Sequence, residues 1–309
     1  MNEIHDIIII GGGPAGYSAA LYAARGGLDT IVLERMSIGG QMTETDSIDN
    51  YPGFDEGVGG IELGMKMQAS AERFGAKTEL ADVTRVEISG KIKRVFTDFG
   101  EYAARAVIIA TGASPRPLGV AHEERFVGRG IHYCGHCDGR FYRDRTLMVI
   151  GGGNSAAEDA LYLSRIAKRV YLVFRRDGLR AEKIYRDAIS RTGNIELIGN
   201  RRVSEILSSD GRVTGARLES TVGEGDLDIE VAALFVSIGR NPASSLFADQ
   251  IQLDAAGYVV ADESTRTSIP GVFAVGDVRT KELRQVVTAV ADGAVAAHYA
   301  EKYIAECSV

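Results

Sequence analysis

The sequence predicts an α/β protein made of two three-layer units, each built around a parallel sheet. The first observation is length, because 309 residues exceed the usual size of one domain, about 100 to 200 residues. The second is an internal repeat: the segment that begins at Ile7 aligns without a gap with the segment that begins at Leu147, 140 residues later. The third is an excess of glycine: 37 of the 309 residues, about 12%, are glycine, where about 7% is usual. Two similar, glycine-containing units account for all three.

Each copy of the repeat predicts a strand, a glycine turn, a helix and a second strand. In the first copy, the apolar run Ile7–Ile10 leads into the turn and the second strand covers 30–33. In the second copy, the second strand covers 170–173. Continuous apolar strands are typical of parallel sheets that are covered on both faces. Each copy is therefore expected to be a βαβ unit of a Rossmann-like, dinucleotide-binding domain.

Two segments read as linkers between these domains. A strand-like segment that ends at Ala110 is followed by Pro115 and Pro117, and another that ends at Ile238 is followed by a Gly-Arg-Asn-Pro sequence at 239–242. The C-terminal segment is expected to complete the first domain. The predicted domains are a discontinuous one, residues 1–114 and 245–309, and one inserted into it, residues 115–244.

Composition excludes several classes of protein. A hydrophobic content of 45% and a charged content of 25% exclude a disordered or low-complexity chain. A net charge of -7 argues against nucleic acid as the general partner, and no apolar run is long enough for a membrane helix. The first ten residues contain no Lys or Arg and too short an apolar run for a secretory signal, so we expect a cytoplasmic protein.

The first glycine turn has the form Gly11-x-Gly13-x-x-Gly16. Its glycines allow a tight turn and a close approach of backbone to pyrophosphate, and the following helix N-terminus attracts the anion. Glu34 closes the second strand, where a carboxylate can accept hydrogen bonds from ribose hydroxyls. A glycine turn without a ligand is the alternative, which the register of strand, helix and acid disfavours.

FAD is the nucleotide expected at this first turn. Asp277 follows Gly276 directly after a strand, where it can hold a ribityl hydroxyl. A helix expected from about Arg284 would point its positive N-terminal end at the flavin pyrimidine ring, where negative charge collects on reduction.

The second turn, Gly151-x-Gly153-x-x-Ala156, lacks an acid at the equivalent of Glu34. That position is Phe174, and three arginines follow it: Arg175, Arg176 and Arg180. Guanidinium groups can bind a ribose 2'-phosphate that a carboxylate would repel. NADPH is therefore expected here; a solvated end of the strand is the alternative for the arginines.

Cys134-Gly135-His136-Cys137, followed by Asp138, predicts a redox dithiol. Structural zinc needs four ligands, and the remaining cysteine, Cys307, and the histidines show no ligand spacing, so no metal is expected. A structural disulfide is disfavoured in a reducing compartment. His136 could stabilise a thiolate, and Asp138 is placed to exchange the proton of thiol chemistry; a turn residue is the alternative for Asp138.

At this point the chain resembles the low-molecular-weight thioredoxin reductases, which are homodimeric flavoproteins, along essentially its whole length. The resemblance rests on a set of motifs: GGGPAG (11–16), GGQ (39–41), NYPG (50–53), ATG (110–112), CxxCDG (134–139), GGGNSA (151–156), RRDGLR (175–180), GD (276–277) and RQ (284–285).

The resemblance implies roles for individual residues. Cys137 would face the flavin, Cys134 would attack the substrate disulfide, and Asp138 would be the acid/base. The implied FAD contacts are Gly11, Gly13, Pro14, Ala15, Gly16, Glu34, Gly40, Gln41, Asn50, Thr111, Gly112, Gly276, Asp277, Arg284, Gln285 and Val286. The implied NADPH contacts are Gly151, Gly153, Asn154, Ser155, Ala156, Arg175, Arg176, Arg180, Ile238, Gly239 and Arg240.

Three positions depart from the family pattern. Cys-Gly-His-Cys replaces the usual Cys-Ala-Thr-Cys, Phe174 stands where many relatives have histidine, and Arg140-Phe141-Tyr142 replaces a frequent pair of phenylalanines. A histidine at the same place in protein disulfide isomerase accompanies a dithiol near -180 mV, against about -270 mV for thioredoxin. We therefore hypothesise that His136 stabilises the reduced dithiol.

The segment around the cysteine pair is basic. Five arginines against two aspartates between Arg125 and Arg145 give a formal charge of +3 in a chain of -7. One interpretation is a site that docks an acidic thioredoxin-like partner, with Arg129, Arg140, Phe141 and Tyr142 as candidates. The other interpretation is that these charges form an ordinary solvated surface.

The predicted function is that of a thioredoxin-disulfide reductase. A hydride passes from NADPH to FAD, and electrons then pass to the Cys134–Cys137 disulfide and to thioredoxin or a thioredoxin-like protein, with domain rotation between the half-reactions. The alternatives are a ferredoxin-dependent flavin thioredoxin reductase, a small-molecule dithiol oxidase and a non-enzymatic flavin-binding redox sensor. The first two have no use for the second turn and its arginines.

Overall fold

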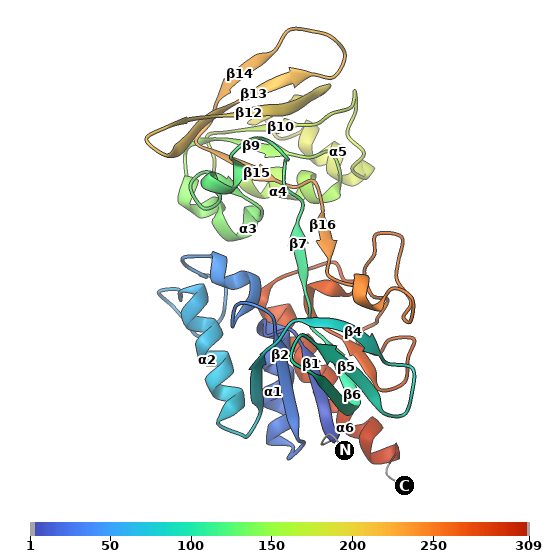
Figure 1. Cartoon of the computed structure of the whole chain (residues 1–309). Helices are drawn as coiled ribbons and strands as arrows, with labels where there is room; N and C mark the ends of the chain where they lie inside the picture. The colour runs from blue at the N-terminus through green and yellow to red at the C-terminus, as the bar shows by residue number, and fades with distance from the viewer. Residues whose placement is uncertain (1–3, 308–309) are drawn as a thin grey trace. The chain divides into compact units, whose positions relative to one another are not determined.

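The computed structural model describes residues 4–307 (Figure 1). The chain divides into two compact units, one containing the described residues up to Ser114 and from Asn241 onward, the other Pro115–Arg240. The inserted unit thus ends at 240, where the sequence analysis placed the boundary at 244. The two connecting segments, β7 (Ala113–Pro115) and β16 (Arg240–Pro242), pair as a two-stranded sheet.

The first unit is built around a seven-stranded sheet in the order β3-β2-β1-β6-β5-β4, with β17 also paired to β6. The parallel strands are β1 (Ile4–Ile10), β2 (Thr30–Glu34), β3 (Lys77–Leu80), β6 (Glu101–Ile109) and β17 (Val272–Ala274). The antiparallel strands are β4 (Val83–Glu87) and β5 (Lys93–Thr97). The helices are α1 (Pro14–Arg25), α2 (Gly60–Glu72) and α6 (Val286–Cys307).

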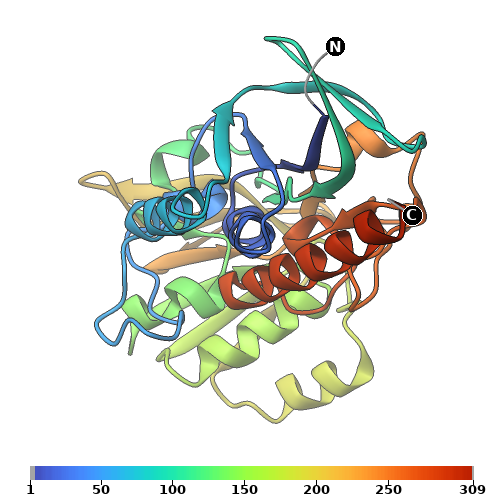
Figure 2. The ribbon, with the colours of Figure 1, turned by 90° about the horizontal axis from the view of Figure 1, so that it is seen from below.

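The central parallel strands of this sheet are buried on both faces. Successive side chains of a strand point to opposite sides, so they contribute to two different cores. Ile7 and Ile9 pack into the core formed with α1 and α6, whereas Ile8 and Ile10 pack into the core on the other face. Helices α1 and α6 lie side by side on one face (Figure 2). A Cβ on Gly293 of α6 would lie 2.2 Å from the Ala15 carbonyl oxygen, so glycine is what lets these helices approach.

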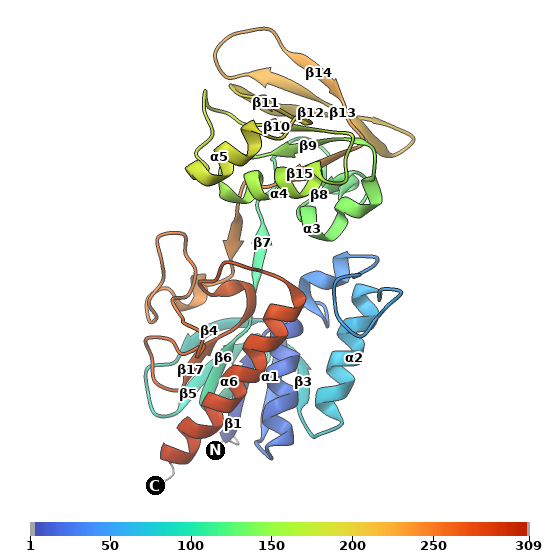
Figure 3. The ribbon, with the colours of Figure 1, turned by 180° about the vertical axis from the view of Figure 1, so that it is seen from behind.

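The second unit has a five-stranded parallel sheet in the order β11-β10-β9-β15-β8. Its strands are β8 (Ile131–His132), β9 (Thr146–Ile150), β10 (Arg169–Val173), β11 (Ile195–Ile198) and β15 (Ala233–Val236). Helices lie over one face and a three-stranded antiparallel sheet over the other (Figure 3). The helices are α3 (Gly135–Asp138), α4 (Asn154–Ser164) and α5 (Lys183–Ser190). The antiparallel strands are β12 (Arg201–Ser209), β13 (Arg212–Ser220) and β14 (Leu227–Glu230).

The predicted fold class is confirmed: both units are α/β with a parallel sheet at the centre. The β1-α1-β2 segment and the β9-α4-β10 segment follow the same order, as the repeat predicts. The helix expected from about Arg284 begins at Val286.

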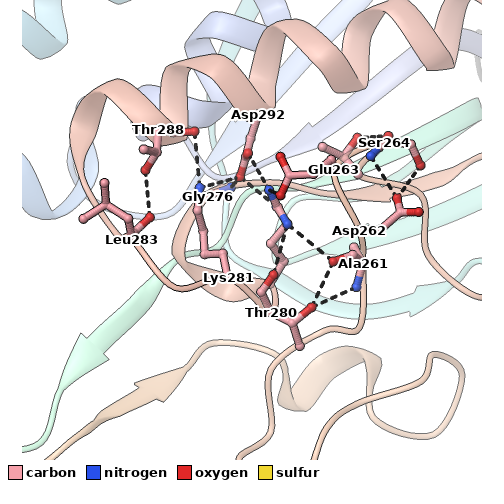
Figure 4. Close-up of polar contacts among 12 residues, drawn as sticks. Ala261, Asp262, Glu263, Ser264, Gly276, Thr280, Lys281, Leu283, Thr288 and Asp292 are labelled. Atoms are coloured by element: carbon pink, nitrogen blue, oxygen red, sulfur yellow. Dashed lines mark hydrogen bonds and ion pairs between the residues drawn. The ribbon is translucent and has the colours of Figure 1, made fainter. Parts of the chain in front are cut away.

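A buried ion cluster ties the start of α6 to the turn after β17 (Figure 4). The Asp292 carboxylate accepts hydrogen bonds from the Gly276 amide at 2.8 Å, from Arg279 at 2.9 and 2.8 Å, and from Lys281 at 2.9 Å. Burial raises the pKa of Asp292, but the hydrogen bonds from Arg279 and Lys281 outweigh it, and the net shift is downward. Asp292 therefore stays ionised inside the protein.

We predict that Asp292→Asn lowers the free energy of unfolding by about 3 kcal/mol, because it leaves two buried cations without their counter-charge. Denaturant titration of the full chain measures this. The matched control is Lys66→Gln, which removes the exposed Lys66–Glu62 pair and is expected to cost less than about 1 kcal/mol.

The same cluster has a pH signature. Because the folded-state pKa of Asp292 lies below its ordinary value of 3.8, its contribution is complete above that value and is lost as the pH falls toward the lowered pKa. Below about pH 4, wild type should lose stability more steeply than Asp292→Asn. Equal slopes for the two proteins would contradict this role.

Candidate active site

The glycine turn of the first unit joins β1 to α1 and forms an open backbone cradle. Gly11 has a φ of +110°, and a Cβ there would lie 2.4 Å from the Ala110 carbonyl oxygen. A Cβ on Gly16 would lie 2.0 Å from the Gly11 oxygen, whereas Gly13 faces open space. Helix α1 begins at Pro14 with no side-chain cap and no acid in its first turn. These features fit a pyrophosphate group, which needs close backbone approach and free N–H donors.

Glu34 lies buried at the end of β2 and is bonded to the backbone around the turn. One carboxylate oxygen accepts the Gly12 amide at 2.7 Å; the other accepts the Met36 and Ser37 amides at 2.9 and 3.1 Å. A carboxylate offers about four acceptor positions, so about one remains for a ribose hydroxyl. The sequence pattern predicts the ribose contact but carries no signal of this second role, in which Glu34 shapes the turn.

The other residues predicted to contact FAD come from loops that follow the strands of this sheet and from the start of α6. Thr111 and Gly112 follow β6, and Gly276 and Asp277 follow β17. Ligands of α/β proteins bind beyond the carboxyl ends of parallel strands, which is where these residues lie.

Several of these residues have partners within the first unit. The Asn50 amide donates to the Gln285 side chain at 3.0 Å, and Gln41 donates to the Ala113 carbonyl. The Thr111 hydroxyl donates to the Ala243 carbonyl at 2.7 Å. The guanidinium of Arg284 lies 4.2 Å above the Tyr258 ring. Gly40 has a φ of +60° at the start of the short helix η1 (Gly40–Glu44).

The second unit repeats the cradle between β9 and α4. Gly151 has a φ of +146°, and a Cβ there would lie 2.3 Å from the Ser237 carbonyl oxygen. Gly153 faces open space, Ala156 is fully buried, and α4 starts with no side-chain cap and no acid in its first turn. Asn154 is bonded to Glu182 through both its amide nitrogen and its oxygen, a pairing that sequence reasoning missed. The cradle again fits a pyrophosphate.

The three arginines after β10 are exposed, whereas Phe174 is buried against the turn. Arg175, Arg176 and Arg180 form no ion pair with another residue in the range 4–307. The Arg180 amide donates to the Gly152 carbonyl at 2.8 Å, which folds the arginine loop over the turn. Phe174 therefore belongs to the core, and exposed guanidinium groups stand next to the cradle, where a 2'-phosphate would need them.

The cysteine pair forms a disulfide, Cys134–Cys137, at the start of α3. Cys134 precedes the helix, and its sulfur accepts the Cys137 amide at 3.2 Å. Both cysteines are partly exposed. A Cβ on Gly135 would lie 2.6 Å from a carboxylate oxygen of Asp159, so the usual alanine of the family pattern would require this side chain to shift.

His136 is held on the outer side of α3. Its ring stacks on Tyr162 at a centroid distance of 4.1 Å, and its Nδ1 lies 3.6 Å from Asp159 Oδ1. The other oxygen of Asp159 accepts the Ser237 hydroxyl. Asp159 was missed in the sequence because it lies on α4, away from the cysteine motif.

Asp138 points to a histidine that the sequence analysis did not single out. Asp138 Oδ2 lies 3.2 Å from Nδ1 of His132, and the Asp138 amide donates to the Cys134 carbonyl at 3.2 Å. The only signal in the sequence is His132 itself, a polar residue between Ile131 and Tyr133 just before the cysteine motif.

The candidate docking residues differ in exposure. Arg129 and Arg140 are exposed, and Phe141 is 55% exposed with the Arg140 guanidinium 4.8 Å from its ring centroid. Tyr142 is partly buried, and its hydroxyl is hydrogen-bonded to His132 at 2.8 Å. Tyr142 is thus engaged internally, whereas Arg140 and Phe141 face outward.

Two further properties concern the described residues as a whole. Among the helices formed by residues 4–307, none combines the length and apolar character needed to span a membrane. Within the same range, no group of three or more His, Cys, Asp and Glu side chains is arranged to hold a metal ion.

Comparisons with known proteins agree with this geometry. A curated thioredoxin reductase from Listeria monocytogenes is 46% identical over 98% of this chain and 95% of its own, and one from Mycolicibacterium smegmatis is 43% identical over 98% and 97%. The crystal structure of thioredoxin reductase from Streptococcus pyogenes superposes with a TM-score of 0.91 at 43% identity, covering 99% of this chain and 100% of that one. The profile of the pyridine nucleotide-disulphide oxidoreductases matches residues 5–293. The chain therefore belongs to the pyridine nucleotide-disulphide oxidoreductase family.

Proposed function

We propose that this protein is an NADPH-dependent thioredoxin reductase. The observation that carries the proposal is a CxxC disulfide in the same unit as a nucleotide cradle with three exposed arginines. The similarity to thioredoxin reductases along nearly the whole chain supports it.

The two cradles assign the two cofactors. The first unit holds FAD through the turn at 11–16, Glu34 and the loops after β6 and β17. The second unit holds NADPH through the turn at 151–156, the arginines and the segment 238–240. When bound, NADPH supplies a hydride and FAD passes its two electrons to the disulfide. The protein supplies binding, orientation and the disulfide itself.

The exchange with the partner follows from thiol chemistry. The Cys134 thiolate attacks one partner sulfur, an intermolecular S–S bond forms, and the partner's own S–S bond breaks. Cys137 then attacks the Cys134 sulfur, which restores the Cys134–Cys137 bond and releases the second partner thiolate. Two electrons leave the enzyme, and two protons reach the partner thiols. Asp138, next to Cys137 in the chain, transfers a proton in this exchange.

The remaining features of the proposal concern assembly and motion. The enzyme acts as a homodimer in the cytoplasm, and the inserted unit rotates on β7 and β16 between the two half-reactions. The support for rotation is that each unit has its own core, so neither depends on one fixed arrangement.

The competing functions do not need the second cradle. A ferredoxin-dependent reductase and an oxygen-using dithiol oxidase have no role for Arg175, Arg176 and Arg180, and a redox sensor would not turn over. Rapid mixing with NADPH separates them. Bleaching of the flavin followed by turnover with oxidised thioredoxin supports the reductase, whereas no bleaching or no turnover contradicts it.

The arginines should set the choice of nicotinamide cofactor. We predict that Arg175→Ala with Arg176→Ala raises KM for NADPH by about 10- to 100-fold, because charge-assisted hydrogen bonds to the 2'-phosphate are lost. KM for NADH should stay within about twofold, since NADH lacks that phosphate. The measurement is steady-state oxidation of each cofactor, with Arg186→Ala on the exposed side of α5 as control. A parallel rise for both cofactors would refute this assignment.

His136 should set the dithiol potential. We predict that His136→Ala shifts the potential of the Cys134–Cys137 pair to more negative values by about 30 mV, equal to 1.4 kcal/mol for two electrons. The imidazole between the two cysteines, which Asp159 holds at 3.6 Å, stabilises the thiolate of the reduced state, so its loss favours the disulfide. Equilibration with glutathione buffers measures the shift. Asp159→Asn should move the potential in the same direction, and unchanged potentials in both variants would rule out the role.

The basic segment should dock the partner. Replacing both Arg129 and Arg140 with Ser is expected to raise KM for thioredoxin several-fold and to flatten its dependence on ionic strength, because charge steers the encounter. Reduction of a small uncharged disulfide is the control and should not change. A salt dependence equal to that of wild type would argue against docking by charge.

A further inference from the structure

A buried polar cluster in the second unit includes Asp138, the residue that follows the cysteine pair in the chain. His132, at the end of β8, is 8% exposed, and both of its ring nitrogens have partners. Nδ1 lies 3.2 Å from Asp138 Oδ2, and Nε2 is hydrogen-bonded to the Tyr142 hydroxyl at 2.8 Å. The ring stacks on Phe235 of β15 at 5.3 Å and contacts the edge of Tyr142 at 5.2 Å. The imidazole is thus fixed with one nitrogen directed at the carboxylate.

The Tyr142 hydroxyl can stay hydrogen-bonded to His132 in both charge states of the imidazole. Burial and the charge of Asp138 raise the pKa of Tyr142 and Arg212 lowers it, with a net rise, so the phenol keeps its proton. Its oxygen can accept the Nε2–H whether or not Nδ1 also carries a proton. Tyr142 can therefore hold the tautomer that carries its proton on Nε2, which is the one that leaves Nδ1 free to take a proton from Asp138.

The charged surroundings of the imidazole are simple. The titratable groups that face it are Asp138 from α3 and Tyr142 from the short helix η3 (Gly139–Tyr142). Phe235, from β15, contributes an apolar ring, and Arg212, at the start of β13, acts on Tyr142. A proton on His132 is therefore balanced mainly by Asp138.

We propose that His132 is a positioning residue that acts through Asp138, holding its carboxylate beside the cysteines and exchanging a proton with it. When a thiol of the reduced pair becomes a thiolate, its proton passes to Asp138 and from there to Nδ1. One S–H bond breaks, one N–H bond forms, and no electrons move. The reverse transfer returns the proton during disulfide exchange. The proposal rests on the proposed reductase function, in which Asp138 handles the proton.

A purely structural role for His132 predicts different behaviour. A buried imidazole could serve only to pack on Phe235 and to satisfy Tyr142. In that case an amide of similar reach, which donates a hydrogen bond to Asp138 but cannot take up a proton, would serve as well. Asparagine at 132 provides this amide, so His132→Asn separates the two roles.

The test is the rate at which iodoacetamide alkylates the reduced full-length protein across pH 5 to 9, which follows the thiolate fraction and needs no turnover. In His132→Asn we expect alkylation to be slower by about tenfold near pH 7, because the proton has no acceptor beyond Asp138. His298→Asn, an exposed histidine on α6, is the matched control and should follow wild type. A wild-type profile in His132→Asn overturns the proposal.

Tyr142→Phe keeps the ring and removes only the hydroxyl. It should slow alkylation in the same direction by less, because the imidazolium loses a stronger hydrogen bond than the neutral ring does. If His132→Asn does not fold, Tyr142→Phe decides alone, and an unchanged profile in it overturns the proposal.

Reduction of the flavin by NADPH, followed by absorbance, separates this inference from the proposed function. We expect it to remain normal in His132→Asn, since that step precedes thiol exchange. A wild-type protein that NADPH does not reduce would end the reductase proposal, whereas the alkylation profile would still decide the role of His132 toward the thiols.

Discussion

Both nucleotide cradles depend on close contact between a glycine and the end of the neighbouring strand. Gly11 lies against the Ala110 carbonyl after β6, and Gly151 lies against the Ser237 carbonyl after β15, so a Cβ at either position would overlap a backbone oxygen. These contacts fix where α1 and α4 begin and leave their first amides open. The proposed positions of the two nucleotides follow from this packing constraint, which is repeated in each unit.

The fold could be predicted from the sequence because its signals are local. Apolar runs, glycine turns and the two copies of the repeat each lie within a short stretch of sequence. The structure has strands and helices at these stretches. The pairings that complete the site are not local. Glu34 bonds to amides on both sides of a turn, Asn154 pairs with Glu182, and Asp159 reaches His136 from another helix. Such contacts depend on loop paths and on the packing of helices, which a periodic pattern does not encode.

The unusual Cys-Gly-His-Cys sequence is explained by one neighbour. Asp159 occupies the space that a side chain at 135 would need, and the same carboxylate approaches His136. The glycine and the histidine of the motif thus both lie against the same acid on α4. With His132 and Asp138, the disulfide segment has two histidine–carboxylate pairs, one with a buried imidazole and one with an exposed imidazole. Under the proposed roles, proton supply and redox potential would be adjusted by different residues.

The split of the first unit has a consequence for synthesis on the ribosome. Strand β17 pairs with β6 at 107–109, and α6 packs on β6 and on α1, yet both are made only after the whole inserted unit. Until then, the end of β6 and the apolar side of α1 lack these partners. At about 5 to 20 residues per second, the inserted unit takes several seconds or more to emerge, and it is complete in sequence first. The nascent chain thus carries a finished second unit next to an unfinished first one, which is the stage at which chaperones have an apolar surface to bind.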